Sequence, residues 1–332
     1  MLNAEQGEGK ELAPEYRVRV LPTFVMLNED GEEVDRWFGY GEDGAEEWVA
    51  AMEEARDDLR PVAAKREAYE REPTLALVRA LARQALYEDP AAAVGHLRTA
   101  LELTDDAEQA ADYQRELFGA LTRAAASGQA SMDEVRAQAD RLVTAPDSDT
   151  ETLVDVTIAL GRLALQTGEP AVVVPYLKQA VERTEGTEDE DLQAFRTQAM
   201  PDYALFVEND PARAVALKRE TLGEAWQESP DKLNEFAWWS FQRRVQLEEA
   251  ERLAMKGAEL AADDGTRANL LDTAAEIAAV RGNLDRAVEL AERAAELAPE
   301  RAFFKRQVEK FRGMKEEEPA GGEKAEGKGA KG

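Results

Sequence analysis

Cysteine is missing from this 332-residue sequence, and histidine occurs once. Without a thiol, the chain as written forms no disulfide, no thiolate metal site and no thiol nucleophile. The single histidine, His96, cannot build a metal cluster or a Ser/His/Asp set by itself. It stands among small and apolar residues on an expected helix, where we interpret it as a packed or surface imidazole. We therefore predict no catalytic residue, no metal and no cofactor.

Positive charge is also scarce: 41 Lys and Arg stand against 69 Asp and Glu, a formal net charge of −28. Such a chain does not neutralise phosphates, which argues against binding to nucleic acid or to an anionic membrane. We interpret the acidity as the solvated outer faces of helices, with a site for a basic partner as the alternative. No apolar run is long enough to cross a bilayer, and residues 1–5 do not resemble a signal peptide. We expect a soluble chain without membrane insertion, in a compartment that the sequence leaves open.

The first sixty residues carry the strand signature of the sequence. Residues 20–27 and 33–38 read as two strands, and the turn between them, 28–31, ends in Asp-Gly, a natural hairpin corner. A helix is expected from Asp43 to Arg56, because apolar residues recur on one face. These residues are Trp48, Val49, Met52 and Ala55.

Residues 12–24, Leu-Ala-Pro-Glu-Tyr-Arg-Val-Arg-Val-Leu-Pro-Thr-Phe, resemble the C-terminal half of a thioredoxin domain, and Gly39 and Tyr40 follow the last strand as in that family. The resemblance covers about a sixth of the chain. It implies that Pro22 is the family's cis-proline and that the backbone of Leu21 pairs with an extended peptide. The family's catalysis also needs a Cys-x-x-Cys half, which would precede Met1 and of which Leu2 and Asn3 are at most a stub.

A plainer interpretation of Pro22 is a turn before an edge strand. Two strands alone are marginally stable in water. This piece is therefore expected to dock against the rest of the chain, to pair with another chain, or to be the remnant of a start site placed too late, which we favour.

From about Arg60 the sequence changes to helices separated by short turns. In the 34-residue tetratricopeptide (TPR) pattern, small residues recur at positions 20 and 27, where the second helix of each hairpin crosses its neighbours closely. The sequence resembles this pattern in five places, with these pairs: Ala93 and Ala100, Val173 and Ala180, Ala214 and Thr221, Ala250 and Gly257, Ala287 and Ala294.

Turns give an independent check on this register. Asp89-Pro90, Glu169-Pro170 and Asp210-Pro211 precede three of the pairs at the same distance, and Asn283 takes the equivalent place in the last hairpin, which Gly282 and Pro299 delimit. An acidic cap followed by proline begins a helix. A further hairpin between Thr104 and Pro146 starts its second helix at the capping box that begins with Ser131, with Ala137 as the expected small residue. Pro201 falls inside a first helix, where a kink or frayed turn is expected.

The fold class we predict is mainly α: a TPR-like α-solenoid of about six helical hairpins, residues 60–312, after a partial thioredoxin-like α/β fragment, residues 1–59. Residues 313–332, rich in Lys, Glu, Gly and Ala, are expected to be a disordered tail. Stacked hairpins curl into a superhelix with a concave wall lined by their first helices. The family's lining positions fall on Lys232, Glu235, Trp239, Gln242, Arg243, Asn269, Asp272 and Glu276. Core packing is favoured for Trp238 and left open for Trp239, because neighbouring residues on a helix face different ways.

The function predicted for the chain as written is a protein-interaction scaffold that binds a protein or an extended peptide. One alternative is a thiol-disulfide oxidoreductase whose cysteines are encoded upstream of Met1. Another is a redox-inactive thioredoxin-like module that adds a peptide strand along Leu21 and Pro22.

Overall fold

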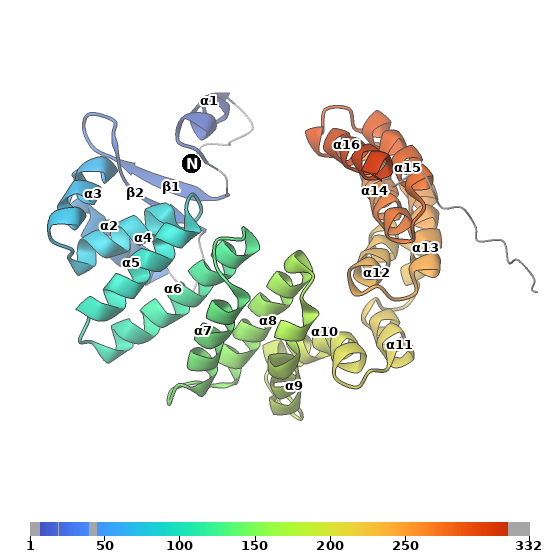
Figure 1. Ribbon diagram of the computed structural model, residues 1–332, viewed down its shortest axis with the longest axis horizontal. Coiled ribbons are helices and arrows are strands. Elements are labelled where there is room, and N and C mark those ends of the chain that lie inside the picture. Colours follow the sequence, from blue (N-terminus) through green and yellow to red (C-terminus); the bar gives the residue numbers. More distant parts are fainter. Residues whose placement is uncertain (1–6, 19, 40–44, 318–332) are drawn as a thin grey trace, which may run out of the picture. The chain divides into compact units, whose positions relative to one another are not determined.

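The computed structural model describes residues 7–18, 20–39 and 45–317 (Figure 1). Within them the chain is almost entirely helical, with one two-stranded sheet. It divides into two compact units between Gly186 and Thr187, which we call unit 1 and unit 2 and describe separately.

Unit 1 begins with a helix, α1 (Gly7–Glu15), followed by the predicted hairpin of β1 (Thr23–Leu27) and β2 (Glu33–Phe38). The strands are antiparallel, with Thr23 opposite Phe38 and a bulge after Met26. The corner forms as its sequence requires, since Gly31 has a φ of +79° and the Asn28 side chain accepts hydrogen bonds from the N–H groups of Asp30 and Glu32. The first strand starts at Thr23, three residues later than Val20, and the Leu21–Pro22 bond is cis.

The next two helices are α2 (Ala45–Arg56) and α3 (Val62–Arg71). Of the expected apolar face of α2, Ala55 is buried, Trp48 and Met52 are half-buried, and Val49 is exposed. Val49 therefore lies off the packed face. Tyr40 and the expected helix start at Asp43 fall outside the described residues.

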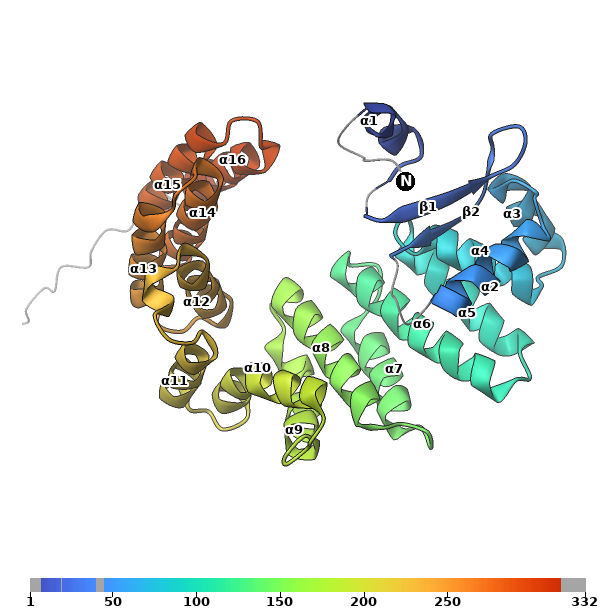
Figure 2. The same ribbon diagram turned by 180° about the vertical axis from the view of Figure 1, so that it is seen from behind.

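The hairpin docks against the helices that follow it, which is one of the three outcomes open to so small a sheet (Figure 2). Val34 and Trp37 of β2 are 1% and 6% exposed. Between them the Asp35 carboxylate accepts a hydrogen bond from the Arg83 guanidinium of α4 (Leu75–Ala85), at 2.6 Å. Lys65 of α3, itself 2% exposed, donates to the Val34 carbonyl at 3.0 Å. These charged groups are buried with partners, so the hairpin and the first helices form one packed body.

Three helical hairpins complete unit 1. They pair α4 with α5 (Pro90–Leu103), α6 (Ala107–Ala126) with α7 (Met132–Thr144), and α8 (Thr150–Thr167) with α9 (Val174–Arg183). The predicted caps form at Asp89 and at Ser131, where the full capping box with Glu134 is present. Glu169-Pro170 starts only a 3-10 turn, η1 (Pro170–Val172), and α9 begins after it.

Unit 2 continues with α10 (Glu190–Phe206) and α11 (Pro211–Thr221), then η2 (Trp226–Glu228), α12 (Pro230–Arg243) and α13 (Leu247–Leu260). After them come α14 (Asp264–Val280), α15 (Leu284–Leu297) and α16 (Ala302–Glu317). Helix α10 is continuous through the buried Pro201, so no frayed turn forms there. Helix α16 includes Gly313 and ends at Glu317, because Phe311 is fully buried and Lys315 pairs with Asp285. The prediction that residues 313–317 are disordered is therefore wrong, because they belong to α16. The rest of the tail, 318–332, lies outside the described residues.

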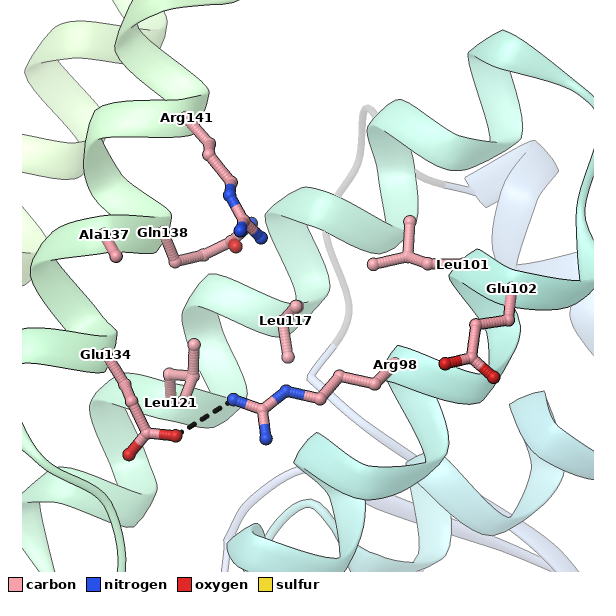
Figure 3. Close-up of a pocket in the computed structure, with 9 residues that line it drawn as sticks. All are labelled: Arg98, Leu101, Glu102, Leu117, Leu121, Glu134, Ala137, Gln138 and Arg141. Carbon is pink, nitrogen blue, oxygen red and sulfur yellow. Dashed lines mark hydrogen bonds and ion pairs between the residues drawn. The ribbon is translucent and has the colours of Figure 1, made fainter.

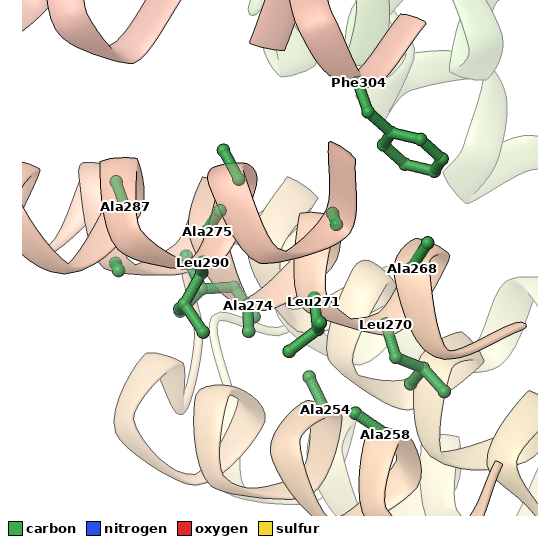
Figure 4. Packing of buried hydrophobic residues seen from close by; sticks show 14 of the residues in the cluster. Ala254, Ala258, Ala268, Leu270, Leu271, Ala274, Ala275, Ala287, Leu290 and Phe304 are labelled. Atoms are coloured by element: carbon green, nitrogen blue, oxygen red, sulfur yellow. The ribbon is translucent and has the colours of Figure 1, made fainter. Parts of the chain in front are cut away.

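The residues of the repeat pattern are buried, as predicted, except Thr221, which is half-buried. Seven alanines have no exposed surface, and Val173 is 7% exposed; the alanines are Ala93, Ala100, Ala180, Ala214, Ala250, Ala287 and Ala294. Figure 4 shows the core of unit 2, where alanines of successive helices meet leucines such as Leu270 and Leu290. A methyl group added at Gly257 would come within 2.7 Å of the Leu270 side chain. Helix packing at these positions has no room for larger groups.

The prediction that Ala137 is the buried small residue of α7 is wrong, because this residue is exposed. The buried face of α7 instead contains Val135, Gln138, Ala139 and Leu142, at spacings of three and four residues. The packing of this face leaves Ala137 on the opposite, outward side of the helix.

Candidate partner-binding surfaces

In unit 2, the helices α10, α12, α14 and α16 are separated along the chain by the second helices of the hairpins. The surface that these four helices share is the one that the repeat pattern predicts for binding. We call this surface of α10, α12, α14 and α16 the A face. On α12, Glu235 accepts from Lys218 at 2.8 Å and from Lys232 at 2.9 Å. Burial alone would raise the pKa of Glu235, but these two hydrogen bonds outweigh it and lower the pKa. Lys232 and Glu235 are therefore half-buried members of an ion-pair cluster.

Trp239 and Arg243 join α12 to α10. The Trp239 indole N–H donates to Asp202 at 3.1 Å, and Arg243 donates to both oxygens of the same carboxylate, at 2.7 and 2.5 Å. Trp239 is only 7% exposed and packs against Phe236 in a core cluster. These two side chains bind the repeats to each other, so little of their surface is left for a partner.

Trp238 is 39% exposed, although core packing was expected for it. The reason is a shift of one residue. In α14 the buried small residue is Ala275, which lies twelve residues before Ala287. In α12 the same place is taken by Ala237, which lies thirteen residues before Ala250. The turn after α12 contains the shift, because both Arg244 and Gln246 have positive φ angles there, 58° and 49°.

Two of the three predicted residues of α14 contact α16, and the third contacts Arg301, directly before that helix. The Gln307 amide donates to Asp272 at 2.9 Å and to Glu276 at 2.7 Å, Lys310 pairs with Glu276, and Arg301 donates to Asn269 at 3.0 Å. Burial, with the nearby Glu276 charge, raises the pKa of Asp272 to about 6 against the opposing hydrogen bond from Gln307. Asn269 is exposed, Glu276 is half-buried and Asp272 is buried.

Trp238 belongs to a row of stacked side chains along α12. Its ring lies 5.0 Å from that of Phe241, and the Arg244 guanidinium lies 5.0 Å from the centre of the Phe241 ring. Gln242 is half-buried beside this row. A rigid, partly exposed tryptophan supported from behind is the kind of residue that contributes most to protein interfaces.

Unit 1 contains a groove between α5 and α7, with α6 beneath them, and its volume is about 370 Å³ (Figure 3). We call it the α5–α7 groove. No prediction from the sequence pointed to it. Its lining combines apolar and charged side chains: Arg98, Leu101, Glu102, Leu117, Leu121, Glu134, Ala137, Gln138 and Arg141.

The predicted peptide-pairing residues lie at the start of β1. Leu21 is 66% exposed, Pro22 is half-buried, and the Pro22 carbonyl accepts from the Gly39 N–H at 2.9 Å. Within the described residues β1 has one strand neighbour, β2. Its other edge has no strand partner among these residues.

No protein family profile matches the sequence, and a search of curated proteins gives no match. Among solved structures, the chain is similar to "TPR2AB-domain:pHSP90-complex of yeast Sti1", with 14% identity and a TM-score of 0.27 over 71% of this chain and 96% of that chain. So low a score carries no argument, and the fold rests on the hairpins and their buried small residues. The array is a TPR-like α-solenoid.

In the described part of this TPR-like array, no helix is long and apolar enough to span a membrane. The same residues contain no group of three or more acidic or histidine side chains placed to hold a metal ion.

Proposed function

We propose that the chain is a protein-interaction scaffold and that the A face of unit 2 binds a polypeptide segment of a partner. The observation that carries this proposal is Trp238, a large aromatic side chain that is 39% exposed and stacked on Phe241. Tryptophan at the centre of an interface supplies a large apolar area at little cost in side-chain entropy. Gln242, one helical turn further along α12, provides an amide group that can hydrogen-bond a peptide backbone, and the exposed Asn269 of α14 provides another.

The predicted wall residues have two roles in this proposal. Lys232, Glu235 and Glu276 form the charged border of the surface, where their ion pairs can be rearranged at small cost because they are partly solvated. Asp272, Trp239 and Arg243 hold the helices that display it.

The test is a peptide-display selection against the whole chain, followed by affinity measurements with the peptides obtained. Trp238→Ala should weaken a peptide that binds the A face by about 30-fold or more, as for a hot-spot residue worth at least about 2 kcal/mol. Leu260→Ala, at a residue 47% exposed on α13, a helix outside the A face, is the matched control and should change the affinity little. If the selected peptides bind the Trp238→Ala variant as tightly as the parent chain, the A face is not the site.

We also propose that residues 1–59 are a partial thioredoxin-like fragment that can add a peptide strand along Leu21 and Pro22. The second edge of β1, which has no strand partner in the described part of the chain, and the exposure of Leu21 support this second function. Leu21→Asp should abolish binding of a labelled extended Val-Thr repeat peptide and leave the melting temperature unchanged. Equal binding by both proteins contradicts this function.

A further inference from the structure

The α5–α7 groove has an apolar floor. Leu117 and Leu121 of α6 lie beneath it, and Leu101 of α5 forms part of one side. The opposite wall, on α7, presents Ala137, whose single methyl group leaves the space between the helices unfilled. The volume of about 370 Å³ is enough for one large apolar side chain and a neighbouring polar group.

The α7 wall is held in place. The Gln138 side chain, 2% exposed, donates to the Gln114 backbone carbonyl at 3.0 Å and to the Gln114 side chain at 2.6 Å. At the start of the helix, Glu134 closes the capping box with Ser131. The groove is therefore a preformed feature of two fixed helices.

Two arginines reach toward the floor from opposite walls, Arg98 from α5 and Arg141 from α7, with Leu117 between them (Figure 3). Among the described residues Arg141 forms no ion pair, in a chain where 69 acidic residues compete for 41 basic ones. Arg98 donates at 3.0 Å to one carboxylate oxygen of Glu134. The other oxygen accepts hydrogen bonds from the backbone N–H and the hydroxyl of Ser131. Both members of that pair are about half exposed, at 52% and 45%, so a competing carboxylate can displace it.

We propose that the α5–α7 groove binds a partner polypeptide through an apolar side chain followed by a carboxylate. The apolar side chain packs on Leu101, Leu117 and Leu121, and the carboxylate accepts hydrogen bonds from Arg141 and Arg98. A planar guanidinium next to an apolar floor suits this combination, because it binds both oxygens of a carboxylate and is weakly hydrated. The groove is formed by α5, α6 and α7 of unit 1 and shares no residue with the A face of unit 2.

Short fluorescein-labelled peptides with the core Ser-Leu-Glu-Ser test this site on the full chain by fluorescence anisotropy. The matched probes replace Glu by Gln, Glu by Lys, or Leu by Ala. The Leu-Glu probe should bind at least about tenfold more tightly than each of the others, the size expected for one charge-assisted hydrogen bond or one buried side chain. Equal binding of the Gln probe, or tighter binding of the Lys probe through Glu102, overturns the proposal.

Two substitutions place the site. Arg141→Gln should weaken the Leu-Glu probe about tenfold, and Ala137→Trp, which fills the groove, should abolish its binding. The matched control is Arg162→Gln on α8, where the arginine is also exposed and without an ion pair among the described residues. It should leave the affinity unchanged, as should Trp238→Ala.

Circular dichroism and melting curves show whether each variant is folded, and Arg141→Gln, at an exposed position, is the variant that decides the matter. Equal losses from Arg141→Gln and Arg162→Gln indicate a general charge effect and refute the site. Sedimentation of the chain alone tests whether the groove binds a second copy of the chain instead of a partner. If Arg141→Gln changes its self-association, the groove contacts a second copy and the proposal is wrong.

Discussion

At the scale of single residues, Asp272 shows how the core of this array contains polar groups. Its side chain is 7% exposed, and the Gln307 amide is its hydrogen-bond donor. The pKa of about 6 means that the carboxyl binds its proton more tightly in the folded chain than in the unfolded one. The associated stability is present at low pH and is lost as the pH rises through 6.

Asp272→Asn should therefore stabilise unit 2 at pH 7.5, by up to about 3 kcal/mol, since one pKa unit corresponds to about 1.4 kcal/mol. The asparagine oxygen can still accept the Gln307 hydrogen bond. The gain should shrink between pH 7 and pH 4, where the native carboxyl is protonated as well. Urea unfolding of both proteins at several pH values measures this, and a gain that does not depend on pH would contradict the assignment.

At the scale of helices and turns, local signals in the sequence were sufficient where the chain follows ordinary capping rules. Asp89, Ser131 and Asn283 cap the helices that they were expected to cap, and β2 has the predicted bounds. The failures occur where an unusual turn or a tertiary contact decides. Arg244 and Gln246 adopt left-handed backbone angles without being glycine, and that turn moved Trp238, not Trp239, to the surface.

The candidate site was therefore predicted as a surface but not residue by residue. The first-helix face could be inferred from the repeat period, because that period depends on small residues close in sequence. The contacts that bury Asp272 and Trp239 come from α16 and α10, which are distant in sequence. No local pattern gives the register of such contacts.

Two glycines inside helices give a direct measure of packing between the elements. Gly257→Ala on α13 should destabilise the chain by about 1 to 2 kcal/mol, because overpacking against Leu270 and Leu233 exceeds the gain in helix propensity. Gly95→Ala on α5 is the matched control, since nothing lies within 4 Å of its added methyl group. It should stabilise by about 0.5 to 1 kcal/mol. Chemical unfolding measures both, and a stabilising Gly257→Ala would show that α13 and α14 are packed less closely.

At the scale of the whole molecule, the chain contains two compact units that are each built by stacking, with the β-hairpin packed on the first helices of unit 1. A solenoid leaves the apolar face of its first repeat without a neighbour unless another element covers it. Val34 and Trp37 of the hairpin provide that cover, and Asp35 fixes it through Arg83. We therefore expect the hairpin to act as the N-terminal cap of the array.

Asp35→Ala tests this role, because it leaves Arg83 without its partner at a position where Asp35 itself is 1% exposed. Breaking such a buried pair costs about 3 to 5 kcal/mol, whereas Glu67→Ala, which removes the exposed Arg71–Glu67 pair, should cost less than about 1 kcal/mol. Hydrogen exchange followed by mass spectrometry locates the effect. Exchange should rise in β2, α3 and α4 and stay unchanged in α12 to α15, whose buried side chains belong to unit 2. If α4 keeps its protection after the substitution, the hairpin is an appendage, and the first repeat is stable without it.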